Sequence, residues 1–240
     1  MEITKLFLLL LILHIIGDFY LQSQQMCDNK RKKGIRSKEL YTHILIISLL
    51  FIPVAICHGA FKWFILIVLS HTAIDIFKSY LEKKYPRWVL HYFFGDQLLH
   101  WSVLAFCAVK ISPLSQPFPL NEELILLILG FLLLFKPTNI LITLVLRQFN
   151  VTPRTEKTLP SAGHLIGNME RILTFILILL NQYSAVGFLI AAKGLLRLRD
   201  NKQTTISTEY VLCGTLLSIG CAFIISICIR HFSSILRLLT

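Results

Sequence analysis

Four pairs of a histidine and an acid, with the members of each pair four residues apart, lie between His14 and His100. The pairs are His14 with Asp18, Glu39 with His43, His71 with Asp75, and Asp96 with His100. Side chains four apart in an α-helix point in the same direction, so each pair presents two metal-ligand groups from one helix face. Eight histidines and 13 acids in 240 residues would give roughly one such pair by chance. Four pairs therefore indicate a built site.

A shift of 57 positions relates the first two pairs to the last two. Adding 57 to the residue numbers of His14 and Asp18 gives His71 and Asp75. The same shift relates the pair Glu39 and His43 to the pair Asp96 and His100. We interpret this as an internal repeat of two helical hairpins. A hairpin that crosses a membrane twice returns to its starting side, so the symmetry axis is expected along the membrane normal. The expected result is a layer of acids at the cytoplasmic mouth and a layer of imidazoles one turn deeper.

Histidine and carboxylate side chains without thiolates suit Zn²⁺, Mn²⁺ or Fe²⁺. The predicted ligands are His14, Asp18, His43, His71, Asp75, Asp96 and His100. This set exceeds the needs of one ion, which leaves two interpretations: two ions, or one ion with further carboxylates that orient the imidazoles. Glu39 is predicted as a weaker eighth member, either a ligand or a general base. Glu39 and Asp96 are the two acids predicted to be catalytic.

The chemistry predicted for such a centre is hydrolysis. A divalent ion lowers the pKa of bound water toward neutrality and supplies a nucleophile where bulk water is scarce. Basic segments flank the pairs, which favours an anionic substrate such as a phosphate- or acyl-ester lipid at the inner leaflet. Lys136 and Arg171 in the second half of the chain are predicted contacts for that anion. Serine catalysis is not indicated, because the chain has no GxSxG motif and Ser70 cannot share a helix face with the adjacent His71.

Three other interpretations of the pairs stay open. The first is a set of interhelical hydrogen bonds or ion pairs that only fixes the packing. The second is transport, because acids and histidines stacked along a bundle axis also pass protons or divalent cations. The third is haem, since one histidine on each of four helices provides axial ligands. A haem ligand, however, does not require the acid that accompanies each histidine.

The elements that must position these residues are transmembrane helices. Hydrophobic residues make up 55% of the chain and charged residues 15%, and the mean hydropathy of +0.68 is too high for a soluble domain. A span needs about 20 mostly apolar residues. We therefore predict an all-α membrane bundle of eight spans, at residues 3–22, 39–57, 61–82, 92–111, 121–148, 163–180, 182–198 and 207–229. The proline-rich stretch 113–119 divides the chain into a duplicated core that holds the site, residues 1–112, and a four-helix half, residues 113–240.

Basic residues are distributed unevenly over this topology. Sixteen of the 24 follow spans one, three, five and seven, and five lie on the other side. Positively charged segments stay in the cytoplasm, so both termini are expected outside. The net charge of +11 is mostly this topology signal and does not indicate a nucleic-acid partner. The run from Lys30 to Lys38, in and directly after a predicted loop at residues 23–37, indicates contact with anionic lipid headgroups, with recruitment of an anionic substrate as the alternative.

The predicted spans of the second half also contain polar residues. Pro137 follows Lys136 near the middle of the fifth span, which predicts a kinked helix that faces the bundle interior. Glu170, Lys193 and Glu209 are predicted to form an interhelical ion-pair network, with a direct functional role as the alternative. The six cysteines show no CxxC spacing, so neither a disulfide framework nor a thiolate metal site is expected.

Three motifs carry a resemblance to a known family: HIIGDFYLQ at residues 14–22, HTAID at 71–75 and DQLLH at 96–100. They resemble an uncharacterised bacterial family of multi-pass membrane proteins, catalogued as a domain of unknown function and similar to membrane-bound metal-dependent hydrolases. The resemblance extends into the second half, at residues 136–139, 163–171, 191–193 and 209–218. It implies a bacterial inner-membrane protein with a metal site. It supplies no substrate, and homo-oligomerisation stays open.

Overall fold

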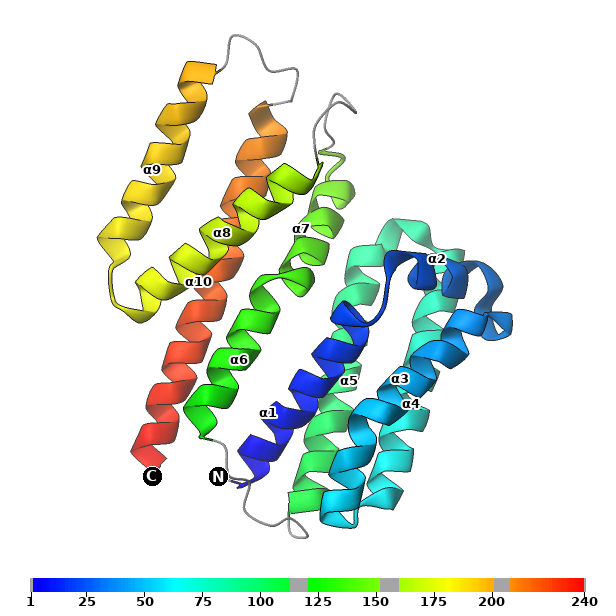
Figure 1. The fold of residues 1–240 in the computed structure, drawn as a ribbon. Coiled ribbons are helices and arrows are strands. Elements are labelled where there is room, and N and C mark those ends of the chain that lie inside the picture. Colours follow the sequence, from blue (N-terminus) through cyan, green and yellow to red (C-terminus); the bar gives the residue numbers. More distant parts are fainter. Residues whose placement is uncertain (1, 113–120, 152–159, 201–207, 240) are drawn as a thin grey trace. The chain divides into compact units, whose positions relative to one another are not determined.

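The computed structural model describes residues 2–112, 121–151, 160–200 and 208–239, and its regular elements within those residues are all helices (Figure 1). The all-α prediction is therefore confirmed. The chain forms two compact units, which we call the N-terminal unit (Met1–Leu132) and the C-terminal unit (Leu133–Thr240).

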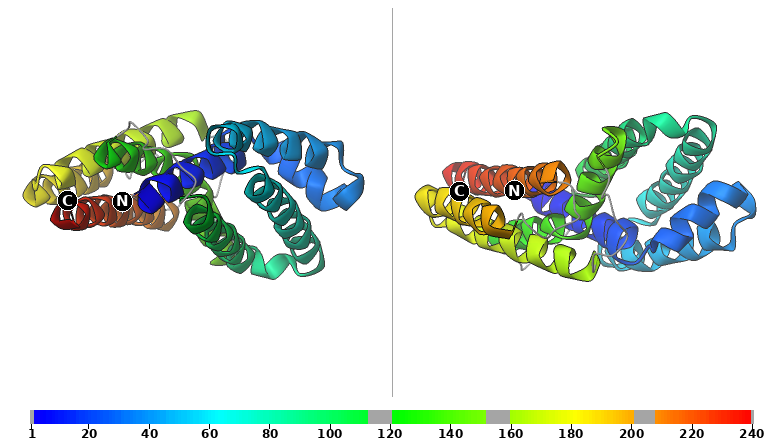
Figure 2. Two further views of the ribbon diagram at one scale, coloured as in Figure 1. Left: turned by 90° about the horizontal axis from the view of Figure 1, so that it is seen from below. Right: turned by 90° about the horizontal axis from the view of Figure 1, so that it is seen from above.

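Four long helices build the N-terminal unit. They are α1 (Glu2–Ile15), α3 (Lys38–His58), α4 (Phe61–Lys84) and α5 (Val89–Ile111). Helix α4 packs against both α3 and α5, and α1 packs against α5 and α3, so that each of the four contacts at least two others (Figures 1 and 2). Helix α6 (Glu122–Leu134) leads from this unit into the next.

The four helices share one apolar core. Its buried members include Leu10 on α1, Phe51 on α3, Ile67 on α4 and Leu104 on α5. On every helix these residues lie on the same side of the histidine, before it on α1 and α4 and after it on α3 and α5. Burial of apolar surface on one side of the histidines therefore fixes the helices where the polar side chains of the other side must meet.

Short elements close the polar end of the bundle. Helix α1 continues into the π-helix η1 (Ile16–Tyr20), and η2 (Gly34–Arg36) and η3 (Pro86–Trp88) are single 3-10 turns. The predicted loop at residues 23–37 contains a helix, α2 (Gln24–Lys33). The Ser23 hydroxyl accepts the Met26 N–H at 3.2 Å, and Gly34 ends the helix with φ +58°. Since a side-chain N-cap and a terminal glycine are standard helix boundaries, the helix was readable from the sequence.

Among the described residues, five helical stretches are long and apolar enough to cross a membrane, which agrees with the membrane protein that the composition predicts. They are Ile3–Tyr20, Lys38–His58, Phe61–Lys84, Glu122–Gln148 and Tyr210–Phe232. The remaining three predicted spans are occupied by α5, α8 (Pro160–Leu179) and α9 (Tyr183–Asp200). Within the described residues, α5 and α8 are not among these five stretches, and α9 contributes a shorter apolar stretch, Tyr183–Leu195. A count of eight spans therefore stays a prediction.

The C-terminal unit contains α7 (Lys136–Gln148), α8, α9 and α10 (Thr208–Leu239), and α10 packs against both α7 and α8. Pro137 interrupts the predicted fifth span, so that α6 ends at Leu134 and α7 begins at Lys136. Proline has no N–H for the carbonyl of Leu133, and the hydroxyl of Thr138 donates to that carbonyl instead, at 2.6 Å. The predicted kink is confirmed.

One ion pair links α8 to α9. Lys193 Nζ lies 2.6 Å from Glu170 Oε2, as the predicted interhelical network requires. The side chain of Glu209, its predicted third member, lies outside the described residues.

Candidate metal centre

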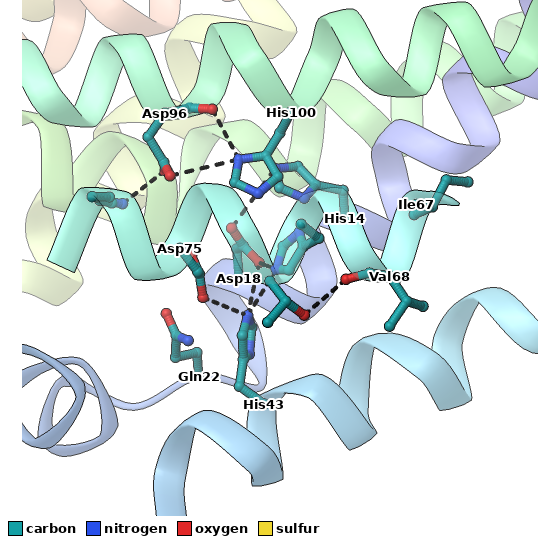
Figure 3. Close-up of polar contacts among 12 residues, drawn as sticks. His14, Asp18, Gln22, His43, Ile67, Val68, Asp75, Asp96 and His100 are labelled. Carbon is teal, nitrogen blue, oxygen red and sulfur yellow. Dashed lines mark hydrogen bonds and ion pairs between the residues drawn. The ribbon is translucent and has the colours of Figure 1, made fainter. Parts of the chain in front are cut away.

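All seven predicted ligands gather inside the N-terminal unit (Figure 3). Their four histidines come one each from α1, α3, α4 and α5, and all four are at most 3% exposed. Ring centroids of His71 and His100 are 4.3 Å apart, and those of His14 and His100 are 4.7 Å apart. The imidazoles therefore form one contiguous buried group.

The tightest part of the site is a trio of Asp18, His43 and His71. The two Nε2 atoms are 3.0 Å apart, and Asp18 Oδ1 lies 3.3 Å from each of them. Three ligand atoms on one ion with bonds of 2.0–2.1 Å are about 3.3 Å apart in tetrahedral geometry. Asp75 Oδ2 adds a fourth ligand atom, 3.5 Å from His43 Nε2. We call these four residues the first position.

Hydrogen bonds alone do not satisfy all three ligand atoms of this trio. A neutral imidazole carries one N–H, so one histidine can donate to the other, but Asp18 Oδ1 is buried without a hydrogen-bond partner among the described residues. Buried lone pairs without donors are costly. A cation among the three atoms would satisfy all of them, and the donor set of imidazole nitrogen and carboxylate oxygen suits a divalent transition metal.

A second position involves Asp18, Asp96 and His100, whose ligand atoms lie within 4.8 Å of one another. His100 Nδ1 is 2.8 Å from the carbonyl oxygen of Asp96 on its own helix. Nδ1 must therefore carry the proton, which leaves the Nε2 lone pair available. Nε2 is buried and has no hydrogen-bond partner among the described residues. Metal-binding histidines have this arrangement, with the far nitrogen fixed by a carbonyl.

Asp18 belongs to both positions. Its Oδ1 faces His43 and His71, and its Oδ2 lies 3.8 Å from His14 Nε2. Asp18 is therefore in contact with three of the imidazoles, and the expected layers of acids and imidazoles stay a prediction. The physical reason is local: Asp18 is part of the π-helix η1, whose wider turn redirects side chains and is common at functional sites.

Gly17 allows η1 to approach α3. A Cβ at this residue would lie 2.5 Å from Ile47 Cδ1 and 3.2 Å from Leu50 Cδ1, so a larger residue would force the Ile47 side chain or the two helices to shift. Gly95 is in the corresponding place beside Asp96, but a Cβ there would meet open space. Only Gly17 is required for close packing, and it brings Asp18 to His43.

Two lysines that sequence reasoning did not assign to the site neutralise two of its acids. Lys30 of α2 is buried, and its Nζ lies 2.5 Å from Asp75 Oδ2. Lys78 Nζ lies 2.7 Å from Asp96 Oδ2. Lys78 lies three residues after Asp75 on the same face of α4, so its proximity to the predicted site could have been predicted from the helical period. No sequence signal reveals Lys30, since only the packing of α2 brings it to an acid 45 positions away.

Helix α2 is tied to the ends of the bundle by further polar contacts. Arg31 pairs with Glu82 of α4 at 2.8 Å. Part of the predicted lipid-binding run is therefore directed inward, at acids of the protein, whereas Lys32, Lys33 and Arg36 are exposed. Burial raises the pKa of the Cys27 thiol on this helix above its usual range, which agrees with α2 lying against the bundle.

The structure does not bring Glu39 into the site. Its carboxylate accepts hydrogen bonds from Asn29 Nδ2 at 2.7 Å and Ser37 Oγ at 2.5 Å, at the beginning of α3. Both oxygens of Glu39 are therefore hydrogen-bonded to residues of α2 and of the α2–α3 connection. The two predicted anion contacts, Lys136 and Arg171, are in the C-terminal unit: Lys136 is exposed at the beginning of α7, and Arg171 is 2% exposed within α8.

Comparison with known proteins gives one match. A family model described as "Protein of unknown function (DUF3307)" matches residues 6–127, a range that contains every residue of the two positions. The parts of the predicted resemblance at residues 136–218 lie beyond the matched range. No curated protein and no solved structure matches the chain.

Proposed function

Because the chain belongs to the DUF3307 family, whose description assigns no activity, we propose a function from the site itself: an integral inner-membrane, metal-dependent hydrolase that acts on an anionic, ester-containing, lipid-like substrate from the cytoplasmic side. The observation that carries the proposal is the trio of Asp18 Oδ1, His43 Nε2 and His71 Nε2, at mutual distances of 3.0–3.3 Å. The five apolar helices of membrane length support the membrane assignment.

The chain's own residues would divide the work as follows. Asp18, His43, His71 and Asp75 would hold the first ion, and His14 and His100 with the other oxygen of Asp18 would hold a second, with Asp96 beside it. The histidines of the two positions correspond under the 57-residue shift, since His43 moves onto His100 and His14 onto His71. A bound divalent ion would supply Lewis acidity and water activation.

Asp96 is the proposed base. Its Oδ2 is held by Lys78 Nζ at 2.7 Å and by Gln97 Nε2 at 3.0 Å. Its Oδ1 is buried without a hydrogen-bond partner among the described residues, so that oxygen is available for a proton from an attacking water. Glu39 is left out of this role because its two oxygens are already bound by Asn29 and Ser37.

Charge favours hydrolysis of an anion over passage of a cation. Three buried carboxylates, Asp18, Asp75 and Asp96, are accompanied by the ammonium groups of Lys30 and Lys78. With neutral imidazoles the group carries one negative charge, and one divalent ion makes it positive. A positive centre attracts a phosphate or carboxylate ester and stabilises the negative charge that develops as it is attacked. Once loaded with the ion, the same positive centre would oppose the passage of a further cation.

The packing of the imidazoles argues against haem. His71 contacts the rings of His14, His43 and His100 at centroid distances of 4.3–5.5 Å. Axial ligation requires a macrocycle between two facing imidazoles, and rings in mutual contact leave no room for one.

The deciding experiment is elemental analysis of the purified full-length protein in lipid nanodiscs. We expect a stoichiometric transition metal that His43→Ala and His71→Ala lose. The matched control is His91→Ala, since His91 is exposed and packs on Trp88 away from the predicted ligands. Metal-free wild-type protein that is folded, or metal retained by both site variants, would overturn the proposal.

A second measurement separates hydrolysis from transport. The metal-loaded protein is incubated with phosphatidylglycerol and with phosphatidic acid, and release of phosphate, glycerol or fatty acid is followed. Asp96→Asn is expected to lower the rate by about 10²–10⁴-fold, as loss of a general base does. Metal-dependent flux of protons or divalent cations without any ester cleavage would assign the same residues to transport.

A further inference from the structure

A second polar cluster lies in the C-terminal unit, where α8 meets α7 and α10. Its centre is Arg171 of α8, which is 2% exposed. Arginine stays protonated in proteins, so this packed helix interface contains a full positive charge. An ionised side chain within a helix of a membrane bundle is a functional-site candidate by default.

Among the described residues, the hydrogen bonds of Arg171 go to neutral oxygens. Nη1 donates to Ser218 Oγ at 2.8 Å, and Nη2 donates to Asn139 Oδ1 at 2.6 Å and to Asn168 Oδ1 at 2.5 Å. The Nε–H is buried and has no acceptor among the described residues. Three of the five N–H groups therefore have acceptors among the described residues, and none of the three is directed at a negative charge.

No described carboxylate of this unit balances that charge. Glu170 is the only acid of the C-terminal unit whose side chain is described, and Lys193 holds it at 2.6 Å. Amide and hydroxyl oxygens satisfy donors but do not cancel a charge, and a buried charge without a counter-ion costs several kcal/mol. For a buried arginine, the loss of a neutral hydrogen-bond partner costs less than the lack of a negatively charged partner.

One hydroxyl on α8 and one on α10 offer further donors. Thr174, one turn further along α8, is fully buried, and its hydroxyl has no partner among the described residues, although threonines in helices usually bond a carbonyl of the preceding turn. The Ser218 oxygen accepts from Arg171, which leaves its own O–H free to donate. Gly167 presents no side chain on the approach to the guanidinium, since a Cβ there would lie 3.6 Å from Nη1.

We propose that Arg171, Thr174 and Ser218 form a binding site for a small oxyanion, a phosphate or carboxylate group, separate from the metal positions. The guanidinium supplies the charge and the free Nε–H, and the two hydroxyls supply neutral donors. Such a group is carried either by a free anion or by the headgroup of an acidic lipid. Asn139 and Asn168 are positioning residues that hold the guanidinium from the other side.

The test uses the full-length protein in nanodiscs of phosphatidylcholine, and it measures the unfolding temperature. One arm adds inorganic phosphate, and the other replaces part of the lipid by phosphatidylglycerol without phosphate. We expect a rise of about 2–4 °C, the effect of roughly 1 kcal/mol on a protein of this size, in at least one arm. The responding arm identifies the source of the anion.

Variants assign the response to the site. Arg171→Met should abolish the rise in unfolding temperature. Thr174→Val and Ser218→Ala should reduce the rise. Because these two variants keep the buried charge, they test the site even if Arg171→Met does not fold. Arg147→Met is the matched control, since Arg147 is an exposed arginine of the same unit. The proposal is overturned if neither arm stabilises the wild-type protein, or if Thr174→Val and Ser218→Ala respond as the wild type does. Metal content is measured in every sample, so failure of the metal centre and failure of the anion site are distinguished.

Discussion

His43 Nε2 and His71 Nε2 are 3.0 Å apart although the two residues are separated by 28 positions and belong to different helices. Two imidazole nitrogens approach this closely only when a proton or a cation lies between them. Asp18 Oδ1, 3.3 Å from both, adds a third lone-pair donor that one shared proton does not satisfy. Under the proposed function, this contact links the stability of the N-terminal unit to metal binding.

Metal removal should destabilise the wild-type protein. Ligand at one hundred times its Kd stabilises the folded state by about 2.7 kcal/mol, so chelation should lower the unfolding temperature by several degrees. His43→Ala should unfold at the same temperature with and without chelator, because its site no longer binds the ion. His91→Ala should respond as the wild type does. An equal response of His43→Ala would show that the chelator acts elsewhere.

Gly17→Ala should destabilise the N-terminal unit by about 1–3 kcal/mol, the usual cost of overpacking, and weaken metal binding. The new Cβ would lie 2.5 Å from Ile47 Cδ1, and Ile47 is fully buried. Ile47→Val removes that methyl group, so the double variant should regain most of the lost stability. Gly95→Ala is the matched control, with an effect near zero or slightly stabilising, since its Cβ meets open space. Equal losses in both glycine variants would contradict the packing explanation.

Lys30→Met should cost about 3–5 kcal/mol, because it leaves the buried Asp75 without its counter-ion. Lys32→Met, two residues along α2 at an exposed position, should change stability by less than about 0.5 kcal/mol. Adding Asp75→Asn to Lys30→Met removes the uncompensated charge and should restore part of the loss in a double-mutant cycle of unfolding measurements. Additive effects of the two substitutions would show that they do not interact.

Cys27 should react slowly with maleimides in a variant whose other five cysteines are replaced. The thiolate is the reactive form, and burial raises the pKa of this thiol. The alkylation rate should therefore keep rising with pH beyond the range in which a free thiol levels off. Lys30→Met releases α2 from Asp75 and should accelerate the reaction at constant pH. A rate that levels off near the pKa of a free thiol would show that α2 does not shield Cys27.

The sequence by itself determined the helical class, the membrane character, the break at Pro137 and the ligand types, because these depend on composition and on the helical period, which are local. Four-residue spacing is enough to place His100 and Asp96 on one face. The internal repeat that relates the pairs stays a prediction, as does the eight-span count.

Only the tertiary structure decided which atoms share a position. Asp18 reaches His43 and His71 because a π-turn and the contact of Gly17 with Ile47 set the approach of two helices, and helical spacing alone places Asp18 one turn away from the imidazoles. The packing of α2 against the ends of α3 and α4 explains two further differences from the sequence prediction. It places Lys30 beside Asp75, and it gives Glu39 hydrogen-bond partners outside the site. Such long-range contacts follow from the burial of apolar surface on whole helices, which no short motif encodes.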